Sequence, residues 1–367
     1  MVKNNDKKII SFHHIGNYYT IVYVLLSNIF PNSVILIPSK ITKKTQELGE
    51  KYSPDSVCTP FKYNMGNYIE SLQRGANVLI QGGGGCRYGY YAELQEQILK
   101  DLGYEFEFVS ILDAGRGNIK KIYEKFKKIE PNISLKKVSY YCIIAYKLMR
   151  LLDNFENYIR ANISYEVVKG QFDKIHSELL KDIMKVKKMS DVKNIQIKYF
   201  QLLENVKLDK NKSKLKVGIV GELFSSMEPF SSFFLERQLA DMNVATKRYT
   251  TATYLLIEKA GARKKLLKEA NKYIQYELGA DGTESVTHSV ELCKQGYDGI
   301  IHIKPFGCTP EINAIPMLQR ISQDYSVPII YFTFDMQTSE VAIKTRLEAF
   351  YDMIKMKKEK SDLLNNV

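Results

Sequence analysis

Strand patterns alternate with helix patterns in two separate blocks of the sequence, and this alternation constrains the fold more than any other feature. In the first block, short apolar runs of the kind that form buried strands occur at residues 7–12, 32–38, 76–81 and 104–112. Helical patterns occur at residues 18–30, 41–52, 64–75 and 91–102. Strands and helices in this order form parallel sheets through βαβ crossovers. The first block is therefore predicted to be an α/β domain.

A second block with the same alternation follows a helical stretch. Its strand patterns occur at residues 216–220, 299–307 and 327–334, and its helical patterns at residues 234–242, 262–278, 312–325 and 341–356. Residues 140–206 show helical patterns and no clear strand pattern, and a polar segment at 207–216 leads into the second block. We therefore predict an α/β protein with two Rossmann-like parallel-sheet domains joined by a helical insertion, divided as 1–115, 116–213 and 214–367.

The overall composition narrows the class of protein. Of the 367 residues, 45% are hydrophobic and 26% are charged, which is typical of a soluble globular protein. No apolar run is long enough to span a membrane, and the first residues lack the apolar stretch of a secretory signal. We therefore expect a cytoplasmic protein without membrane contact. Its five cysteines are then free thiols, metal ligands or nucleophiles rather than disulfides.

The net charge of +12 would attract nucleic acid, the phosphates of coenzyme A or an acidic protein partner. The lysines are spread along the chain, with higher local density at residues 120–137, 181–216 and 355–360. Such lysines are more typical of solvated helix faces, so nucleic-acid binding is not expected.

The most unusual segment is the glycine loop, residues 81–91 (QGGGGCRYGYY), which follows a predicted strand and precedes a predicted helix. It matches neither the dinucleotide-binding pattern, because Arg87 replaces the third glycine, nor the P-loop, because Tyr90 and Tyr91 replace the Lys and the Ser or Thr. Glycines can still bring backbone N–H groups close to a bulky anion. A cysteine at a helix start beside an arginine, as expected for Cys86, favours the thiolate that binds iron or attacks an electrophile. The alternative is a tight turn with an unreactive thiol.

Two more cysteines occupy similar places in the two blocks. Cys58 and Cys308 each stand in a Cys-Thr-Pro sequence where a loop or strand end meets a helix. Ligands of parallel sheets gather beyond the carboxyl ends of strands, so we expect a cleft between the two domains to collect Cys58, Cys86 and Cys308. Three thiolates suit an iron–sulfur cluster with one open iron better than a structural zinc ion, which needs four ligands. Spacing alone leaves this open, because the three cysteines are far apart and the sequence has no Cys-x-x-Cys.

The remaining candidate residues have simpler interpretations. Cys142 and Cys293 fall on helical faces and are expected to be small packed side chains. His13 and His14 follow the first strand, and they either face the predicted cleft or make structural hydrogen bonds. The glycine turn at residues 218–222 is expected to be an ordinary strand-to-helix connection.

Three motifs together resemble the family related to the D-component of 2-hydroxyglutaryl-CoA dehydratase: CTPFK, GGGGCRYGYYAELQ and PFGCTPE. The resemblance covers most of residues 8–112 and 214–354. It implies an oxygen-sensitive protein with a 4Fe–4S cluster held by Cys58, Cys86 and Cys308. The neighbouring residues are then expected to line the cluster pocket; they are Gly84, Gly85, Arg87 and Tyr88.

The resemblance also implies a function. It points to an enzyme subunit, a component of a 2-hydroxyacyl-CoA dehydratase-like lyase that acts on an acyl-CoA substrate and accepts one electron from a separate ATP-dependent activator. Dehydratases of this class have two dissimilar subunits, so a second homologous subunit and a dimer are expected. Two alternatives remain open: an ATP-dependent small-molecule reductase related to double-cubane cluster proteins, and a non-catalytic electron-transfer or scaffold subunit. A double cubane is less expected, because relatives often carry an additional cysteine in a Gly-Pro-Cys-Arg loop, whereas this loop offers one thiol, that of Cys86.

Overall fold

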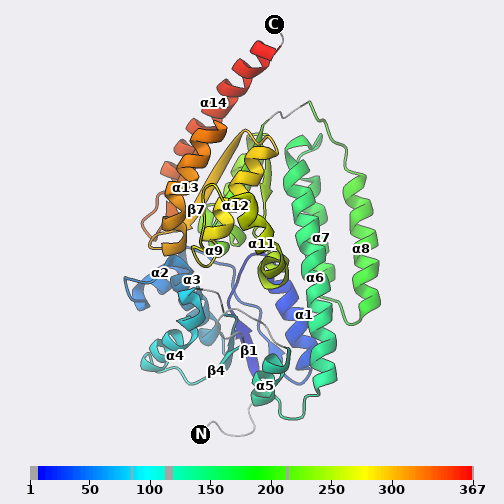
Figure 1. The fold of residues 1–367 in the computed structure, drawn as a ribbon. Helices are drawn as coiled ribbons and strands as arrows, with labels where there is room; N and C mark the ends of the chain where they lie inside the picture. The colour runs from blue at the N-terminus through cyan, green and yellow to red at the C-terminus, as the bar shows by residue number, and fades with distance from the viewer. Residues whose placement is uncertain (1–6, 84–85, 112–118, 212–214, 366–367) are drawn as a thin grey trace. The chain divides into compact units, whose positions relative to one another are not determined.

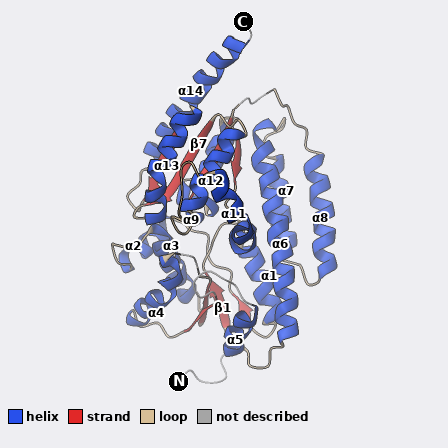
Figure 2. Cartoon of the chain, viewed as in Figure 1, coloured by secondary structure: helices blue, strands red, loops and turns tan. Residues whose placement is uncertain are grey.

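The computed structural model describes residues 7–83, 86–111, 119–211 and 215–365. The chain forms two compact units. The first comprises Met1–Leu152 and Ile175–Leu203, and the second comprises Asp153–Lys174 and Glu204–Val367. Figure 1 traces the order of the helices and strands along the chain, and Figure 2 shows strands flanked by helices.

A four-stranded sheet forms the centre of the first unit. The elements of this region are β1 (Ile9–Phe12), α1 (Tyr19–Ile29), β2 (Val34–Ile35), α2 (Lys43–Tyr52), α3 (Thr59–Gln73), β3 (Val78–Gln81), the short 3-10 helix η1 (Arg87–Tyr90), α4 (Tyr91–Asp101), β4 (Glu107–Ser110) and α5 (Ile119–Ile129). The strand order is β2-β1-β3-β4, and every neighbouring pair is parallel. The predicted parallel sheet of the first block is therefore confirmed.

Both faces of this sheet are buried, as the apolar sequences of its strands predict. On β3, Val78 and Ile80 pack into one core together with side chains of β1 and α1. The intervening Leu79 packs into a second core with side chains of α3 and α4. Successive side chains of a strand point to opposite faces, so this alternation means that helices cover the sheet on both sides.

Two glycines determine how closely α3, which begins after Cys58, approaches α2. A Cβ atom at Gly66 of α3 would stand 1.9 Å from the carbonyl oxygen of Thr45 in α2. A Cβ atom at Gly49 of α2 would stand equally close to the carbonyl oxygen of Lys62 in α3. Because glycine has no Cβ, the backbones of the two helices can meet directly at both points.

Helices also fill the middle of the chain. They are α6 (Leu135–Asn162), the 3-10 helix η2 (Ile163–Tyr165), α7 (Gln171–Ile183) and α8 (Met189–Glu204). In Figure 1, α6, α7 and α8 lie side by side, and the hydroxyl of Tyr199 in α8 donates to Asp182 in α7 over 2.7 Å. The boundaries between the two units fall within these helices. The domain division at 1–115, 116–213 and 214–367 stays a prediction.

The second unit repeats the sheet arrangement of the first. Its elements are β5 (Lys216–Gly221), α9 (Leu223–Met227), the 3-10 helix η3 (Pro229–Ser232), α10 (Leu235–Asp241), β6 (Ala245–Arg248), the π-helix η4 (Tyr254–Glu258), α11 (Lys259–Glu269), α12 (Gly282–Lys294), β7 (Gly299–Pro305), α13 (Thr309–Tyr325), β8 (Ile329–Phe334) and α14 (Glu340–Asn365). The strand order is β6-β5-β7-β8, again with parallel pairs throughout. The predicted fold class, with two Rossmann-like parallel sheets, is therefore confirmed.

The second unit differs from the sequence prediction in two places. No strand was predicted at β6, because Thr246, Lys247 and Arg248 do not form an apolar run, yet β6 pairs with β5 at the edge of the sheet. The helix expected at 262–278 ends at Glu269. Beyond it, Ile274 is buried in the core beside α12 and α13, so tertiary packing outweighs the helical pattern there. None of the described helices has the length and apolar character of a membrane span.

Candidate functional site

Each sheet has one point at which the winding of the chain reverses. β1 lies between β2 and β3, and β5 lies between β6 and β7. In open α/β sheets, ligands bind beyond the carboxyl ends of the two strands that meet at such a switch point. The loops that follow β1 and β3 form this point in the first unit, and the loops that follow β5 and β7 form it in the second. The glycine loop follows β3, and Cys308 follows β7.

The three predicted cysteine ligands all stand at helix starts. Cys58 is the N-cap of α3, Cys308 is the N-cap of α13, and Cys86 is the N-cap of η1, which continues directly into α4. Free N–H groups at a helix start carry partial positive charge, which favours a thiolate over a thiol. In both Cys-Thr-Pro sequences the proline lies in the first helical turn, where its missing N–H costs no helical hydrogen bond.

The other two cysteines have a different environment. Cys142 lies inside α6, where burial raises the pKa of its thiol to about 11. Cys293 lies inside α12 in the core of the second unit, and burial raises its pKa to about 12. Both thiols are therefore protonated at neutral pH, and the prediction that they are packed side chains is confirmed.

The first unit brings two of the candidate thiols to one tyrosine. The Sγ atom of Cys58 lies 2.6 Å from the hydroxyl oxygen of Tyr91, the first residue of α4. Burial raises the pKa of Tyr91, and the nearby thiols of Cys58 and Cys86 raise it further. The Tyr91 hydroxyl is therefore protonated and can donate a hydrogen bond to sulfur. The ring is buried, as the helical pattern predicts.

The predicted pocket-lining residues fall into three groups. Gly84 and Gly85 lie outside the described residues. Arg87 is exposed, whereas Tyr88 is buried and its backbone N–H donates to the Sγ atom of Cys86 over 3.5 Å. That these four residues line a cluster pocket stays a prediction.

His13 follows β1 and makes hydrogen bonds on both ring nitrogens. Its Nε2 lies 3.1 Å from the hydroxyl of Tyr88, and its Nδ1 lies 3.2 Å from the hydroxyl of Tyr68. Burial lowers the pKa of His13 to about 4, and the neighbouring His14 acts in the same direction. The imidazole is therefore neutral at physiological pH. The structural hydrogen bonds expected for His13 are therefore observed, and its position facing a cleft stays a prediction.

In the second unit, Cys308 lies near a largely buried lysine. Lys304, close to the end of β7, is only 5% exposed. Burial lowers the pKa of Lys304, while Cys308 and Glu311 act in the opposite direction. Glu311 in turn lies 2.7 Å from Nε2 of His302, and both of these side chains are completely buried. Lys304 thus places positive charge near the Cys308 sulfur.

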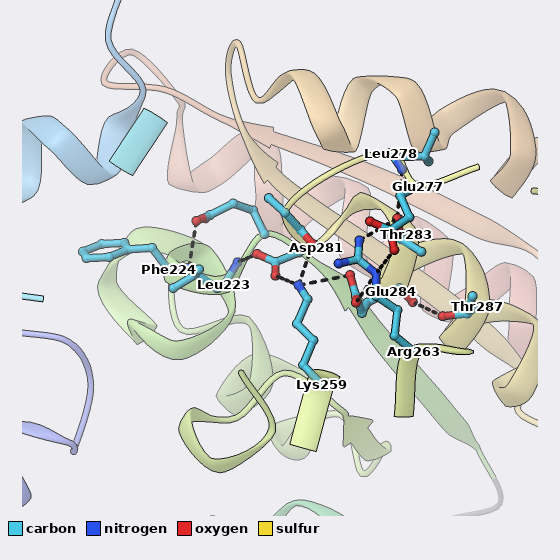
Figure 3. A network of polar contacts seen from close by, with 12 residues as sticks. Leu223, Phe224, Lys259, Arg263, Glu277, Leu278, Asp281, Thr283, Glu284 and Thr287 are labelled. Atoms are coloured by element: carbon cyan, nitrogen blue, oxygen red, sulfur yellow. Dashed lines mark hydrogen bonds and ion pairs between the residues drawn. The ribbon is translucent and has the colours of Figure 1, made fainter. Parts of the chain in front are cut away.

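The start of α12 corresponds to the start of α3, because each helix precedes the third strand of its sheet. Where α3 has Cys58 as its N-cap, α12 has Asp281. Figure 3 shows the ammonium group of Lys259 between two carboxylates, at 3.0 Å from Asp281 and 3.1 Å from Glu284. Arg263 also approaches Glu284, at 3.9 Å. The second unit therefore has a buried ionic network where the first unit has a thiol.

Glu222 follows β5 at the switch point of the second sheet. Its carboxylate accepts hydrogen bonds from the backbone N–H groups of Phe224 and Ser225, over 3.0 and 2.9 Å. Burial raises the pKa of Glu222 to about 7, against the effect of these hydrogen bonds. The preceding Gly221 has a φ of +138°, and a Cβ atom there would stand 1.9 Å from the carbonyl oxygen of Ile303. The segment 218–222 is thus a strand-to-helix connection, as expected. In it, the backbone at Gly221 lies close to that of Ile303, and Glu222 caps α9.

Two of the three candidate thiolates belong to one unit and the third to the other. Cys58 and Cys86 lie in the first unit, and Cys308 lies in the second. Within the described ranges, no group of three or more His, Cys, Asp or Glu side chains is arranged to hold a metal ion. The three-cysteine ligand set therefore stays a prediction.

Similarity to a known protein family extends over nearly the whole chain. The 2-hydroxyglutaryl-CoA dehydratase D-component family matches residues 24–354 of this sequence. The chain belongs to this family. The match contains Cys58, Cys86 and Cys308 and reaches into both units, and it confirms the resemblance on which those residues were selected. No curated protein sequence matches the chain.

Several residues of this D-component family member escaped sequence analysis. The Asp281-x-x-Glu284 spacing is a helix-start signal that could have located the start of α12. No comparable signal exists for His302 and Glu311, because a strand residue and a helix residue meet only once α13 packs on β7. Lys304 lies in a predicted strand among apolar residues, and the sequence contains no signal that its side chain is buried.

Proposed function

We propose that this chain is the cluster-bearing component of a reductively activated 2-hydroxyacyl-CoA dehydratase-like system. A 4Fe–4S cluster would be held by Cys58, Cys86 and Cys308. The observation that carries the proposal is the division among the five cysteines. Cys86 and Cys308 begin helices in loops at the switch points, and Cys58 begins α3 and contacts Tyr91 of α4, whereas Cys142 and Cys293 are packed inside helices.

The residues present fit such a cluster. Three thiolates leave one iron of a cubane open, and a bound cluster would supply one-electron chemistry together with that open coordination position. The Tyr88 N–H and the Tyr91 hydroxyl are placed to donate to sulfur, and Lys304 offsets negative charge near Cys308. Hydrogen bonds to sulfur and nearby cations are among the groups by which a protein adjusts the potential of a cluster.

The proposal also specifies partners. The electron would come from a separate ATP-dependent activator protein, and a second homologous subunit would complete the enzyme as a dimer in the cytoplasm. The net charge of +12 would favour association with an acidic activator and with the phosphates of an acyl-CoA substrate. On this proposal the chain takes part in a lyase reaction that removes water from a 2-hydroxyacyl thioester.

Anaerobic purification tests the proposal directly. The wild-type protein should be brown, with roughly four irons and four sulfides per chain and the electron paramagnetic resonance of a reduced cluster. Replacing Cys58, Cys86 or Cys308 singly by Ala should remove iron. The matched controls, Cys142→Ala and Cys293→Ala, should retain it, because their thiols are buried in helix packing. A colourless protein, a protein with zinc alone, or equal iron loss from all five variants would contradict the proposal.

A further inference from the structure

A row of hydrogen bonds joins five side chains beneath the glycine loop of the first unit. The amide nitrogen of Asn64 donates to the hydroxyl of Tyr88 over 2.8 Å, and that hydroxyl lies 3.1 Å from Nε2 of His13. Nδ1 of His13 lies 3.2 Å from the hydroxyl of Tyr68, which donates to the side-chain oxygen of Gln81 over 3.0 Å. The row therefore begins and ends on amides, with an imidazole at its centre.

The order of protons along this row follows from its two ends. Because the Tyr68 hydroxyl donates to the Gln81 side-chain oxygen, the Tyr68 oxygen accepts from the N–H at Nδ1 of His13. Nε2 is then the acceptor of a neutral imidazole, and the ring proton lies on Nδ1, which donates to Tyr68. The Tyr88 hydroxyl, which accepts from Asn64, then donates its hydrogen bond to Nε2. The lowered pKa of His13, about 4, agrees with a neutral ring.

Elements of the first unit other than η1 position four of the five members of this row. Asn64 and Tyr68 lie on α3, Gln81 ends β3, and His13 directly follows β1. Tyr88 alone belongs to η1, the short 3-10 helix that begins after Cys86. The row therefore ties the loop to the two strands that meet at the switch point and to the helix that begins at Cys58.

Tyr88 connects the row to both candidate thiols of the first unit. Its backbone N–H donates to the Sγ atom of Cys86 over 3.5 Å. Its ring packs against the ring of Tyr91 with centroids 5.3 Å apart, and the Tyr91 hydroxyl contacts Cys58. A shift of the Tyr88 ring would therefore disturb the hydrogen-bond donors at both sulfurs.

We propose that His13 is a positioning residue: by accepting a hydrogen bond from the Tyr88 hydroxyl, it fixes the segment Cys86–Tyr90 and the N–H donor at the Cys86 sulfur. The proposal rests on the proposed function in so far as Cys86 is a cluster ligand. His13 itself touches neither thiol in this role, and it acts through Tyr88. Donation to a ligand sulfur withdraws negative charge, so loss of the donor should shift a cluster potential to more negative values.

The first test is independent of any cluster. The variant Tyr88→Phe keeps the ring and removes the hydroxyl. The matched control is Tyr90→Phe, which removes a hydroxyl from a neighbouring side chain that is 71% exposed. In cluster-free protein, backbone amides of residues 86–90 should exchange hydrogen about tenfold faster in Tyr88→Phe and in His13→Ala, and at the wild-type rate in Tyr90→Phe. Nitrogen-15 spectra of the wild type should show the neutral ring of His13 with its proton on Nδ1. A proton on Nε2, or equal exchange in all four proteins, would overturn the proposal.

The second test uses protein with its cluster. The reduction potential of Tyr88→Phe should be more negative than that of the wild type and of Tyr90→Phe, with a changed electron paramagnetic resonance signal. Faster exchange with an unchanged potential and signal would show a merely structural contact and would overturn the positioning role. A wild-type protein that binds no cluster would refute the proposed function instead, while the exchange rates and the ring tautomer would still judge the role of His13.

Discussion

Replacing Lys259 by Met should destabilise the second unit, because it removes the cation between two buried carboxylates (Figure 3). Asp281 and Glu284 keep only 7% and 6% of their side-chain surface exposed. Loss of one partner from a fully buried ion pair costs about 3–5 kcal/mol. Lys259 is 17% exposed and Arg263 remains 3.9 Å from Glu284. We therefore expect a loss of about 2–3 kcal/mol in the free energy of unfolding, below the full cost of an unpaired buried charge.

The loss should also depend on pH. Burial raises the pKa of Glu284, and Lys259 opposes that increase, so the pKa rises further when Lys259 is removed. A carboxyl group with a raised folded-state pKa contributes stability that is present below its unfolded pKa and is lost as the pH rises through the folded value. The Lys259→Met variant should therefore lose most stability above neutral pH and recover part of it in mild acid.

Urea unfolding followed by circular dichroism measures this effect, since the chain has no tryptophan. Lys272→Met is the matched control, because Lys272 and Asp324 form an ion pair whose side chains are 67% and 38% exposed. That control should lose much less stability, because solvent screens an exposed ion pair. A second variant, Lys259→Met combined with Glu284→Gln, should regain stability at pH 8. Equal losses for Lys259→Met and Lys272→Met at every pH would refute the argument.

Two further predictions concern glycines and the second switch point. Gly66→Ala should lower the free energy of unfolding by about 1–3 kcal/mol, because the new Cβ atom would meet the Thr45 carbonyl group. The control is Gly261→Ala in α11, where no atom lies within 4 Å of the new Cβ atom. That variant should raise the free energy of unfolding by up to about 1 kcal/mol. Urea midpoints check both, and a harmless Gly66→Ala would contradict the close helix packing. Because the pKa of Glu222 is raised from 4.5 to about 7, its contribution to stability is complete below pH 4.5 and is lost as the pH rises through 7. The melting temperature of Glu222→Gln should therefore improve relative to the wild type between pH 5 and pH 8, and a constant difference would exclude this titration.

The candidate site could be predicted from sequence only in its local parts. Cys58, Cys86 and Cys308 were selectable because a cysteine before Thr-Pro or after a glycine run marks a helix start within a few residues of itself. The residues that contact these cysteines could not be identified from the sequence. Tyr91 lies 33 residues from Cys58, and Tyr88 lies 75 residues from His13, so no local pattern records either contact.

The sequence by itself indicated the two parallel sheets, because short strand patterns such as Val78–Gln81 and Gly299–Pro305 alternate with helical patterns in each block. Tertiary structure alone decided that the polar segment Ala245–Arg248 becomes a strand, since its pairing groups are offered by β5. It also decided which charges are buried, as for Lys259 between Asp281 and Glu284. The physical reason is the separation of the interacting residues along the chain. Backbone preferences and hydrophobic periodicity depend on near neighbours in sequence, whereas burial, ion pairs and the direction of hydrogen bonds depend on residues that only folding brings together.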